Sequence, residues 1–137
     1  MSRSVRAMTP ERSPLVGVWR LTAYDDRASE SDPWGATFGE NPTGRADYHP
    51  DGFLSIHIAS TPDTPTVAPY FAYFGTWVLR ETTQTAAGTA GVVEHQIIAC
   101  THPDWVEGDP TRPFLVNGDE LMLGDGRTSR RCFVRLA

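Results

Sequence analysis

The chain consists of short segments in which apolar and polar residues alternate, separated by turn-forming residues. The first segment, residues 16–24, follows Pro14 and is rich in β-branched and aromatic side chains, which favours a strand over a helix. Because side chains alternate along a strand, we expect Trp19 to point into the core and Tyr24 to lie on the opposite face. The segment therefore predicts a strand organised around one buried tryptophan.

Seven further segments have the same character. They are expected at residues 44–49, 53–58, 71–79, 92–101, 114–117, 120–123 and 128–136. Pro50-Asp51-Gly52 has the composition of a tight turn, and Asn117-Gly118 between two apolar arms is typical of a type I′ hairpin. Gly75 indicates a bend or bulge, and residues 82–91 are expected to form a polar turn region.

Eight strands without a convincing amphipathic helix between them predict an all-β antiparallel meander. Such strands can close into an eight-stranded up-and-down barrel, whose interior pocket is wide enough for a small ligand. A two-sheet sandwich is the alternative architecture. The barrel is better supported.

The length of 137 residues fits a single domain. Residues 1–13 are polar and predict a flexible tail, so the barrel domain is expected to span residues 14–137. The net charge of −5 argues against a nucleic-acid partner, and no apolar run approaches the roughly 20 residues that span a bilayer. Two cysteines are too few for a disulfide scaffold, which favours reduced thiols in a cytoplasmic protein. A homodimer stays open.

If Trp19 faces inward, hydrophobic pairing places the apolar faces of the other strands around it, as in a ligand pocket. The side chains then expected inside are Tyr48, Leu54, Ile56, Ile58, Phe71, Tyr73, Trp77, Leu79, Val93, His95, Ile97, Ala99, Phe114, Val116, Leu121 and Leu123. The titratable groups among them are Tyr48, Tyr73 and His95. They are the candidates for orienting a ligand.

The connection at residues 25–43 is polar, yet it carries Trp34 and Phe38. Two large aromatic side chains in a polar loop predict a lid that folds onto an apolar surface. The alternative is that they only pack the loop against the barrel rim. Residues 60–69 contain three prolines and form the second expected lid loop.

Six motifs stand in order along the chain. They are Leu15-Val-Gly-Val-Trp-Arg-Leu21, Asn41-Pro-Thr-Gly-Arg45, Tyr48-His-Pro-Asp-Gly-Phe53, Tyr73-Phe-Gly-Thr-Trp77, Pro103-Asp-Trp105 and Asn117-Gly-Asp-Glu-Leu121. This set resembles the bacterial and fungal lipocalin-like domain family over nearly the whole chain from Leu15. The resemblance implies a small calycin-type barrel in which an arginine of the last strand (Arg130, Arg131 or Arg135) stacks on Trp19. Members of the family are encoded near natural-product biosynthesis genes, and the resemblance implies the same setting for this protein.

The family pattern also places a second histidine directly after the first on the fifth strand, and here Gln96 stands in that position. A function that needs the histidine pair would therefore not transfer to this chain.

His95 is the leading catalytic candidate. Burial should lower its pKa and keep it neutral near pH 7, so that it can accept or relay a proton. Tyr48 or Tyr73 could donate a hydrogen bond to a developing enolate or alkoxide. This set suits a cofactor-independent cyclisation or isomerisation. The structural alternative is a buried histidine that bonds a tyrosine hydroxyl only for packing.

Further side chains are candidates for ligand contact. Trp77, Trp34 and Phe38 would shape the walls, and Ile56, Phe71, Ile97, Phe114, His57 and Arg45 complete the expected ligand-binding set. His57 and Asp47 could also form a base with its orienting carboxylate across the hairpin, or a solvated cross-strand pair.

Arg45 and Arg112 could hold the polar end of a ligand at the mouth, or be ordinary surface charges. No histidine shows ligand spacing, so no metal site is expected.

Three hypotheses on function follow. The leading one is a cofactor-independent cyclase or isomerase that acts on a hydrophobic natural-product (polyketide-like) intermediate. The second is a carrier that binds a small hydrophobic ligand without changing it. The third is a structural subunit with a filled core.

Overall fold

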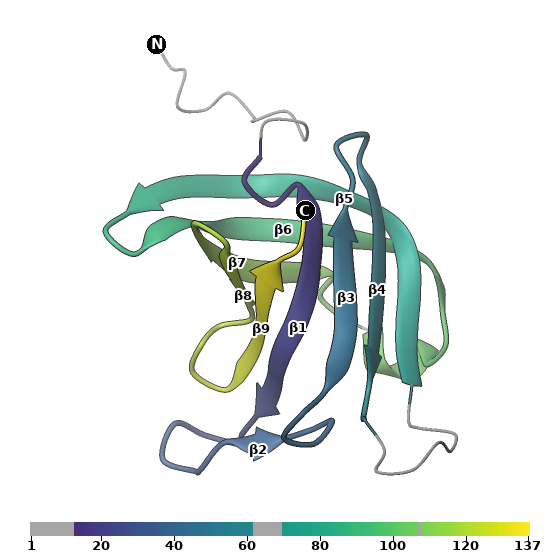
Figure 1. Ribbon diagram of the computed structural model, residues 1–137, viewed down its shortest axis with the longest axis vertical. Coiled ribbons are helices and arrows are strands. Elements are labelled where there is room, and N and C mark those ends of the chain that lie inside the picture. The colour runs from purple at the N-terminus through teal and green to yellow at the C-terminus, as the bar shows by residue number, and fades with distance from the viewer. Residues whose placement is uncertain (1–12, 62–69, 107) are drawn as a thin grey trace.

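A computed structural model describes residues 13–61, 70–106 and 108–137. All strands belong to one antiparallel sheet in the order β2-β1-β3-β4-β5-β6-β7-β8-β9, and β1 also pairs with β9 (Figure 1). The strands are β1 (Gly17–Asp26), β2 (Gly35–Ala36), β3 (Thr43–Tyr48), β4 (Phe53–Ala59), β5 (Tyr70–Thr85), β6 (Gly88–Cys100), β7 (Thr111–Asn117), β8 (Glu120–Leu123) and β9 (Ser129–Arg135). The β1–β9 pairing closes an eight-stranded barrel, which confirms the predicted fold.

The short strand β2 is not one of the eight strands that form the barrel. It pairs with the last two residues of β1, Asp25 and Asp26, where β3 no longer does. Within the described residues the helical segment is the short 3₁₀ helix η3 (Pro103–Val106). The predicted tail at residues 1–13 lies outside the described residues except for Ser13, and the second expected lid loop does so beyond residue 61.

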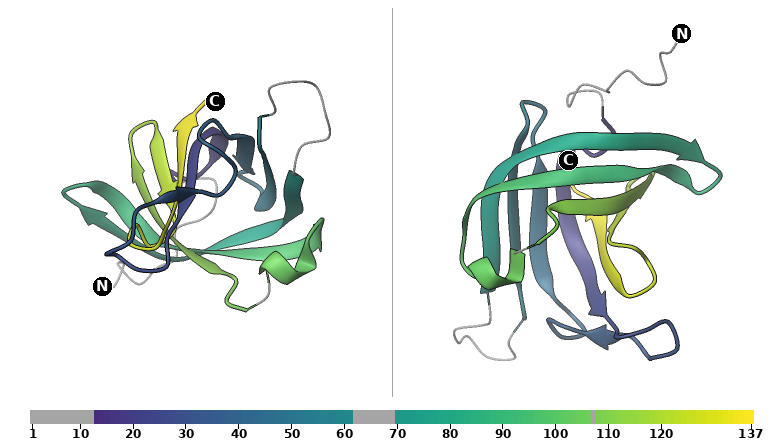
Figure 2. Two further views of the ribbon diagram at one scale, coloured as in Figure 1. Left: turned by 90° about the horizontal axis from the view of Figure 1, so that it is seen from below. Right: turned by 180° about the vertical axis from the view of Figure 1, so that it is seen from behind.

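The hairpin of β5 and β6 is longer than predicted. The region at residues 82–91 is not a polar turn, because Thr82 pairs with Gly91 and Thr85 pairs with Gly88 around a tight turn. Both strands bend strongly and cross the barrel in the views of Figure 2. The side chains of residues 80–85 are exposed, so this end of β5 has no buried face and carries no apolar alternation.

The two predicted turns both occur, one with altered geometry. Residues 49–52 connect β3 to β4, and Gly52 has the positive φ of 93° that the turn was expected to need. In the second hairpin Asn117 pairs with Glu120, so the loop residues are Gly118 and Asp119. A type I′ turn needs a positive φ at both, and only Gly118 has one, so the turn follows the type II′ pattern.

Two bulges change which side chains face inward. The first lies between Leu21 and Ala23 of β1, and it turns Tyr24 toward the core, against the prediction. The second lies at Gly75, where the bend was predicted, because Gly75 pairs with Ile97 while Phe74 pairs with Ala99. Beyond that bulge Ala99 is exposed and Cys100 packs against the core instead, so the inward position of Ala99 was wrong.

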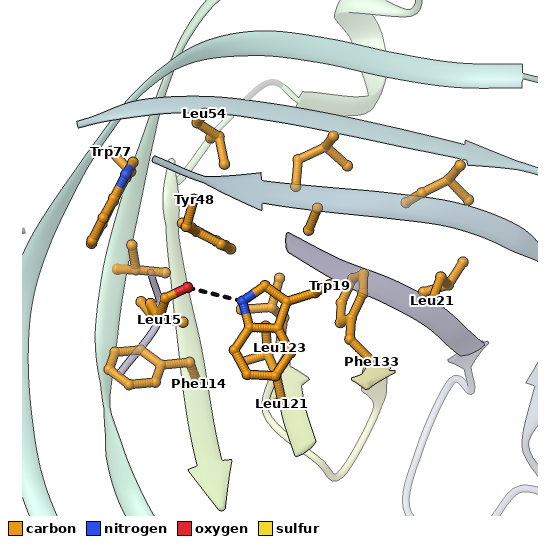
Figure 3. Close-up of a cluster of buried hydrophobic side chains, with 14 of the residues drawn as sticks. Leu15, Trp19, Leu21, Tyr48, Leu54, Trp77, Phe114, Leu121, Leu123 and Phe133 are labelled. Carbon is orange, nitrogen blue, oxygen red and sulfur yellow. Dashed lines mark hydrogen bonds between the residues drawn. The ribbon is translucent and has the colours of Figure 1, made fainter. Parts of the chain in front are cut away.

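One end of the barrel is filled by large side chains (Figure 3). Trp19 is fully buried, and its Nε1 donates a hydrogen bond of 2.9 Å to the carbonyl of Leu15. The guanidinium of Arg135 lies 4.2 Å from the Trp19 ring, as the family resemblance implies, and donates to the carbonyls of Pro14 and Val16. The segment before β1 is thereby fixed across this end.

Both cysteines, Cys100 and Cys132, are free thiols. In the described part of the chain no helix has the length and apolar character needed to cross a membrane.

Replacement of Trp19 by Phe should lower the free energy of unfolding by about 2–4 kcal/mol, because it leaves a cavity and removes the donor to Leu15. Urea denaturation of the two proteins measures the difference. Trp34→Phe is the control: its indole is stacked between arginines in a loop, and we expect a loss of about 1 kcal/mol or less. An equal loss in both variants would contradict the central position of Trp19.

Candidate functional site: a buried histidine and the barrel cavity

His95 on β6 lies between two tyrosine hydroxyls inside the barrel. Its Nε2 is 2.6 Å from the hydroxyl of Tyr48, the last residue of β3, and its Nδ1 is 2.8 Å from the hydroxyl of Tyr73 on β5. The exposed fractions are 1% for His95 and Tyr48 and 7% for Tyr73. The structure therefore brings together the three predicted catalytic candidates.

Strand geometry explains this meeting. Tyr73 and His95 lie on neighbouring antiparallel strands with their side chains inward, and Trp77 is directly opposite His95. Trp77 also packs edge-on against the ring of Tyr48, with centroids 5.3 Å apart. The tryptophan thus holds Tyr48 in place from the filled end.

Burial determines the protonation of the three groups. It lowers the pKa of His95 to about 3, with a further contribution from the positive charge of Arg112. It raises the pKa of Tyr73 to about 12 and that of Tyr48 well above its usual value, and in both cases Arg112 opposes the rise. At neutral pH the cluster therefore consists of a neutral imidazole and two protonated hydroxyls.

A neutral imidazole has one N–H donor and one acceptor nitrogen, so the hydrogen bonds of the cluster are donated in one direction along the three residues. Among the described residues, His95 Nε2 is the hydrogen-bond partner of the buried Tyr48 hydroxyl. If Tyr48 donates to Nε2, its proton is satisfied, and His95 Nδ1–H then donates to Tyr73. The reverse tautomer would leave a buried O–H without an acceptor, at a cost of about 1–3 kcal/mol. The favoured arrangement leaves the Tyr73 proton available toward the cavity.

A cavity of about 400 Å³ lies at the end of the barrel away from Trp19. It lies where β1, β4 and β8 end and where β5, β7 and β9 begin. Its apolar wall consists of Ile56, Ile58, Phe71, Pro113, Leu123 and Phe133, and its polar groups come from Tyr24, Tyr73, Asp109, Thr111, Arg112, Asp125, Ser129 and Arg131. Tyr73 is the member of the histidine cluster that lines it.

The sequence-predicted ligand residues divide between the two halves of the barrel. Ile56 and Phe71 line the cavity beside Tyr73. Trp77 and Phe114 are buried in the core, away from the cavity lining. Ile97 is partly buried and borders an outer depression with its neighbours on β6.

The aromatic pair in the loop after β1 packs at the rim and does not line the cavity. Phe38 is buried and meets the ring of Tyr24 edge-on, with centroids 4.9 Å apart. Trp34 is stacked between the guanidinium groups of Arg27 and Arg130, at 4.0 and 4.2 Å from its ring. Of the two predicted roles, the structure shows packing against the rim.

The predicted pair of His57 and Asp47 does not form. The β3–β4 register places Arg45 opposite His57, whose Nδ1 is 2.6 Å from the Tyr70 hydroxyl. Asp47 accepts instead from Arg45 at 3.0 Å on the same strand. His57 and Arg45 border a shallow outer depression and not the barrel cavity, because both lie on the outward face of their strands.

Several cavity residues were not expected as ligand contacts. Tyr24 was assigned to the outer face because the β1 bulge has no visible sequence signal. Asp109 and Arg131 lie next to turns. Arg112 was considered for the mouth, and its spacing from Phe114 and Val116 is the signal that it faces inward. In the described part of the chain no three His, Cys, Asp or Glu side chains cluster so that they could hold a metal ion.

The fold and the cavity define a class of protein, the small closed β-barrel with a ligand-sized interior. A family model described as lipocalin-like domain matches residues 16–131. The match covers most of the chain, so the protein belongs to the lipocalin-like domain family, as its motifs indicated. A barrel of this family is consistent with the binding of a small hydrophobic molecule. Neither the curated proteins nor the solved structures give a significant match.

The buried state of His95 predicts a pH dependence of stability. Its pKa is about 3 in the folded barrel and near 6.5 when unfolded, so between these values the unfolded chain binds the extra proton. Stability should therefore fall as pH drops from about 6.5 to 3, by at most about 1.4 kcal/mol per pH unit from this group. Urea denaturation between pH 4 and 7 should show a shallower slope in His95→Gln. The exposed His49→Gln is the control, and an unchanged slope in both would contradict the assignment.

Proposed function

We propose that this protein binds a small, mostly apolar molecule in the barrel cavity. The observation that carries the proposal is the cavity of about 400 Å³ at one end of the barrel, walled by side chains such as Ile58 and Phe71. This volume lies within the range of roughly 300–1,000 Å³ that small-molecule sites occupy. The filled-core hypothesis describes the end around Trp19.

The apolar dye N-phenyl-1-naphthylamine should bind the native protein saturably, with a rise in fluorescence and one site per chain. Ile58→Trp places extra volume in the cavity and should weaken binding by about fivefold or more. Thr83→Trp is the matched control, because it adds a tryptophan to an exposed position of β5. A dye that does not saturate, or that ignores Ile58→Trp, would remove the support for a cavity ligand.

A second candidate function is catalysis, as a cofactor-independent cyclase or isomerase of a natural-product intermediate. The observation that favours it is the Tyr73 hydroxyl, which lines the cavity and is backed by His95 and Tyr48. In this proposal hydroxide or a buffer base from solvent removes the α-proton of the substrate, and Tyr73 donates a hydrogen bond to the carbonyl oxygen and stabilises the enolate that forms. His95 does not line the cavity, so its role changes from acid or base to positioning residue.

Catalysis of this kind predicts faster exchange of α-protons in an apolar ketone. With 2-tetralone in D₂O, followed by NMR, the protein should accelerate deuterium incorporation over buffer. Tyr73→Phe should lower this acceleration by about 10²-fold or more while dye binding changes little. His95→Gln should lower it less. If the wild-type protein shows only the buffer rate of exchange, catalysis is contradicted and the carrier function is the one candidate left.

Two statements remain predictions from the sequence: that the protein is cytoplasmic and that it has no nucleic-acid partner. The formation of a homodimer remains an open alternative.

A further inference from the structure

Arg112 is an arginine on the inward face of the barrel. On β7 it alternates in phase with the buried Phe114 and Val116, and its register partner is the buried Val93 of β6. The side chain is half-buried and lines the cavity. A charged side chain is unusual on the inward face of a strand whose other inward residues are buried and apolar.

The charge of Arg112 has no carboxylate within 4 Å among the described residues. Its Nη1 donates to the carbonyls of Asp109 at 3.3 Å and of Thr111 at 3.2 Å. By contrast, the other arginine of the lining, Arg131, pairs with Asp26 at 2.8 Å and stacks on Tyr24. Arg112 therefore retains donor capacity toward the cavity.

The acidic groups of the lining are bound within their own loops. Asp125 accepts hydrogen bonds from the backbone of residues 127–129, which lowers its pKa. Asp109 accepts from the backbone N and the Oγ1 of Thr111, and the charge of Arg112 contributes to the lowering of its pKa. Asp109 is exposed at the rim. The charged group on the deeper wall near Tyr73 is therefore the guanidinium of Arg112.

Arg112 and Tyr73 act on the same place. Arg112 favours ionisation of Tyr73 through its charge and through a side-chain hydrogen bond, and its charge disfavours protonation of His95. Because Tyr48 donates to His95 and His95 donates to Tyr73, the proton of the Tyr73 hydroxyl remains free to point into the cavity. The two groups together offer a guanidinium and a hydroxyl donor, which is a combination that binds an anionic oxygen strongly.

We propose that the cavity ligand is an amphipathic acid, whose carboxylate or equivalent oxyanion accepts hydrogen bonds from both Arg112 and the Tyr73 hydroxyl while its apolar body contacts the aliphatic wall. This inference rests on the proposed binding function and adds the chemical class of the ligand. Of the two arginines that the sequence offered for the polar end of a ligand, it selects Arg112, because Arg45 lies on the outside of the barrel.

The test is displacement of bound N-phenyl-1-naphthylamine by decanoate and by 1-decanol at pH 7.5. The two competitors share an alkyl chain, and the alcohol is the more apolar. Wild-type protein should nevertheless bind decanoate about tenfold more tightly than decanol. Arg112→Gln should remove this preference, Arg112→Lys should retain most of it, and Tyr73→Phe should reduce it by about threefold or more.

Arg80→Gln is the charge-matched control, because Arg80 lies on the exposed part of β5 and pairs with Glu94. It should leave the preference unchanged. Equal displacement by the two competitors in the wild-type protein would overturn the inference and leave the binding function standing. A preference that survives Arg112→Gln would also overturn it. Failure of the dye itself to bind would overturn the proposed function instead, and this inference with it.

Discussion

Closure between the first and the last strand is the constraint on which the other features of this barrel depend. Seven residue pairs join β1 to β9, and Arg135 at the end of β9 covers the Trp19 ring and binds the segment that precedes β1. Closure joins the two end strands of the barrel and brings Arg131 of the last strand beside Tyr24 of the first, and Phe133 beside Leu21. Without it, the filled end would lose its central tryptophan and the cavity would lose one wall.

Sequence reasoning succeeded wherever the strands are regular. The alternation that predicts Tyr48, Tyr73 and His95 inside holds because their strands keep a period of two up to those positions. It failed after bulges: one extra residue near Leu21 reverses the face of Tyr24, and one at Ile98 reverses that of Ala99. Such insertions have no signal in a single sequence unless, as at Gly75, a glycine allows two backbones to approach closely.

The histidine cluster was predictable in its members, whereas most of the cavity lining was not. Burial and pairing indicated a histidine among tyrosines, but which of them faces open space depends on how far the core fills the barrel. That depends on the packing of Leu15, Trp19 and Trp77, which no periodicity shows. As a result His95 lies behind Tyr73 and not at the cavity surface. For the loop residues Trp34 and Phe38 the sequence left a lid and rim packing both open, and the rings pack at the rim against two arginines and Tyr24.

The position of the cavity at one end of the barrel also limits the path that a ligand could take to it. The end around Trp19 is closed by side chains, so the route to Tyr73 and Arg112 begins where β1 ends and β7 starts. An acid bound as proposed would enter with its oxyanion first and leave by the same opening. Its tail would then lie toward the opening, so the barrel would discriminate sharply on the leading group and tolerate variation in the length of the tail.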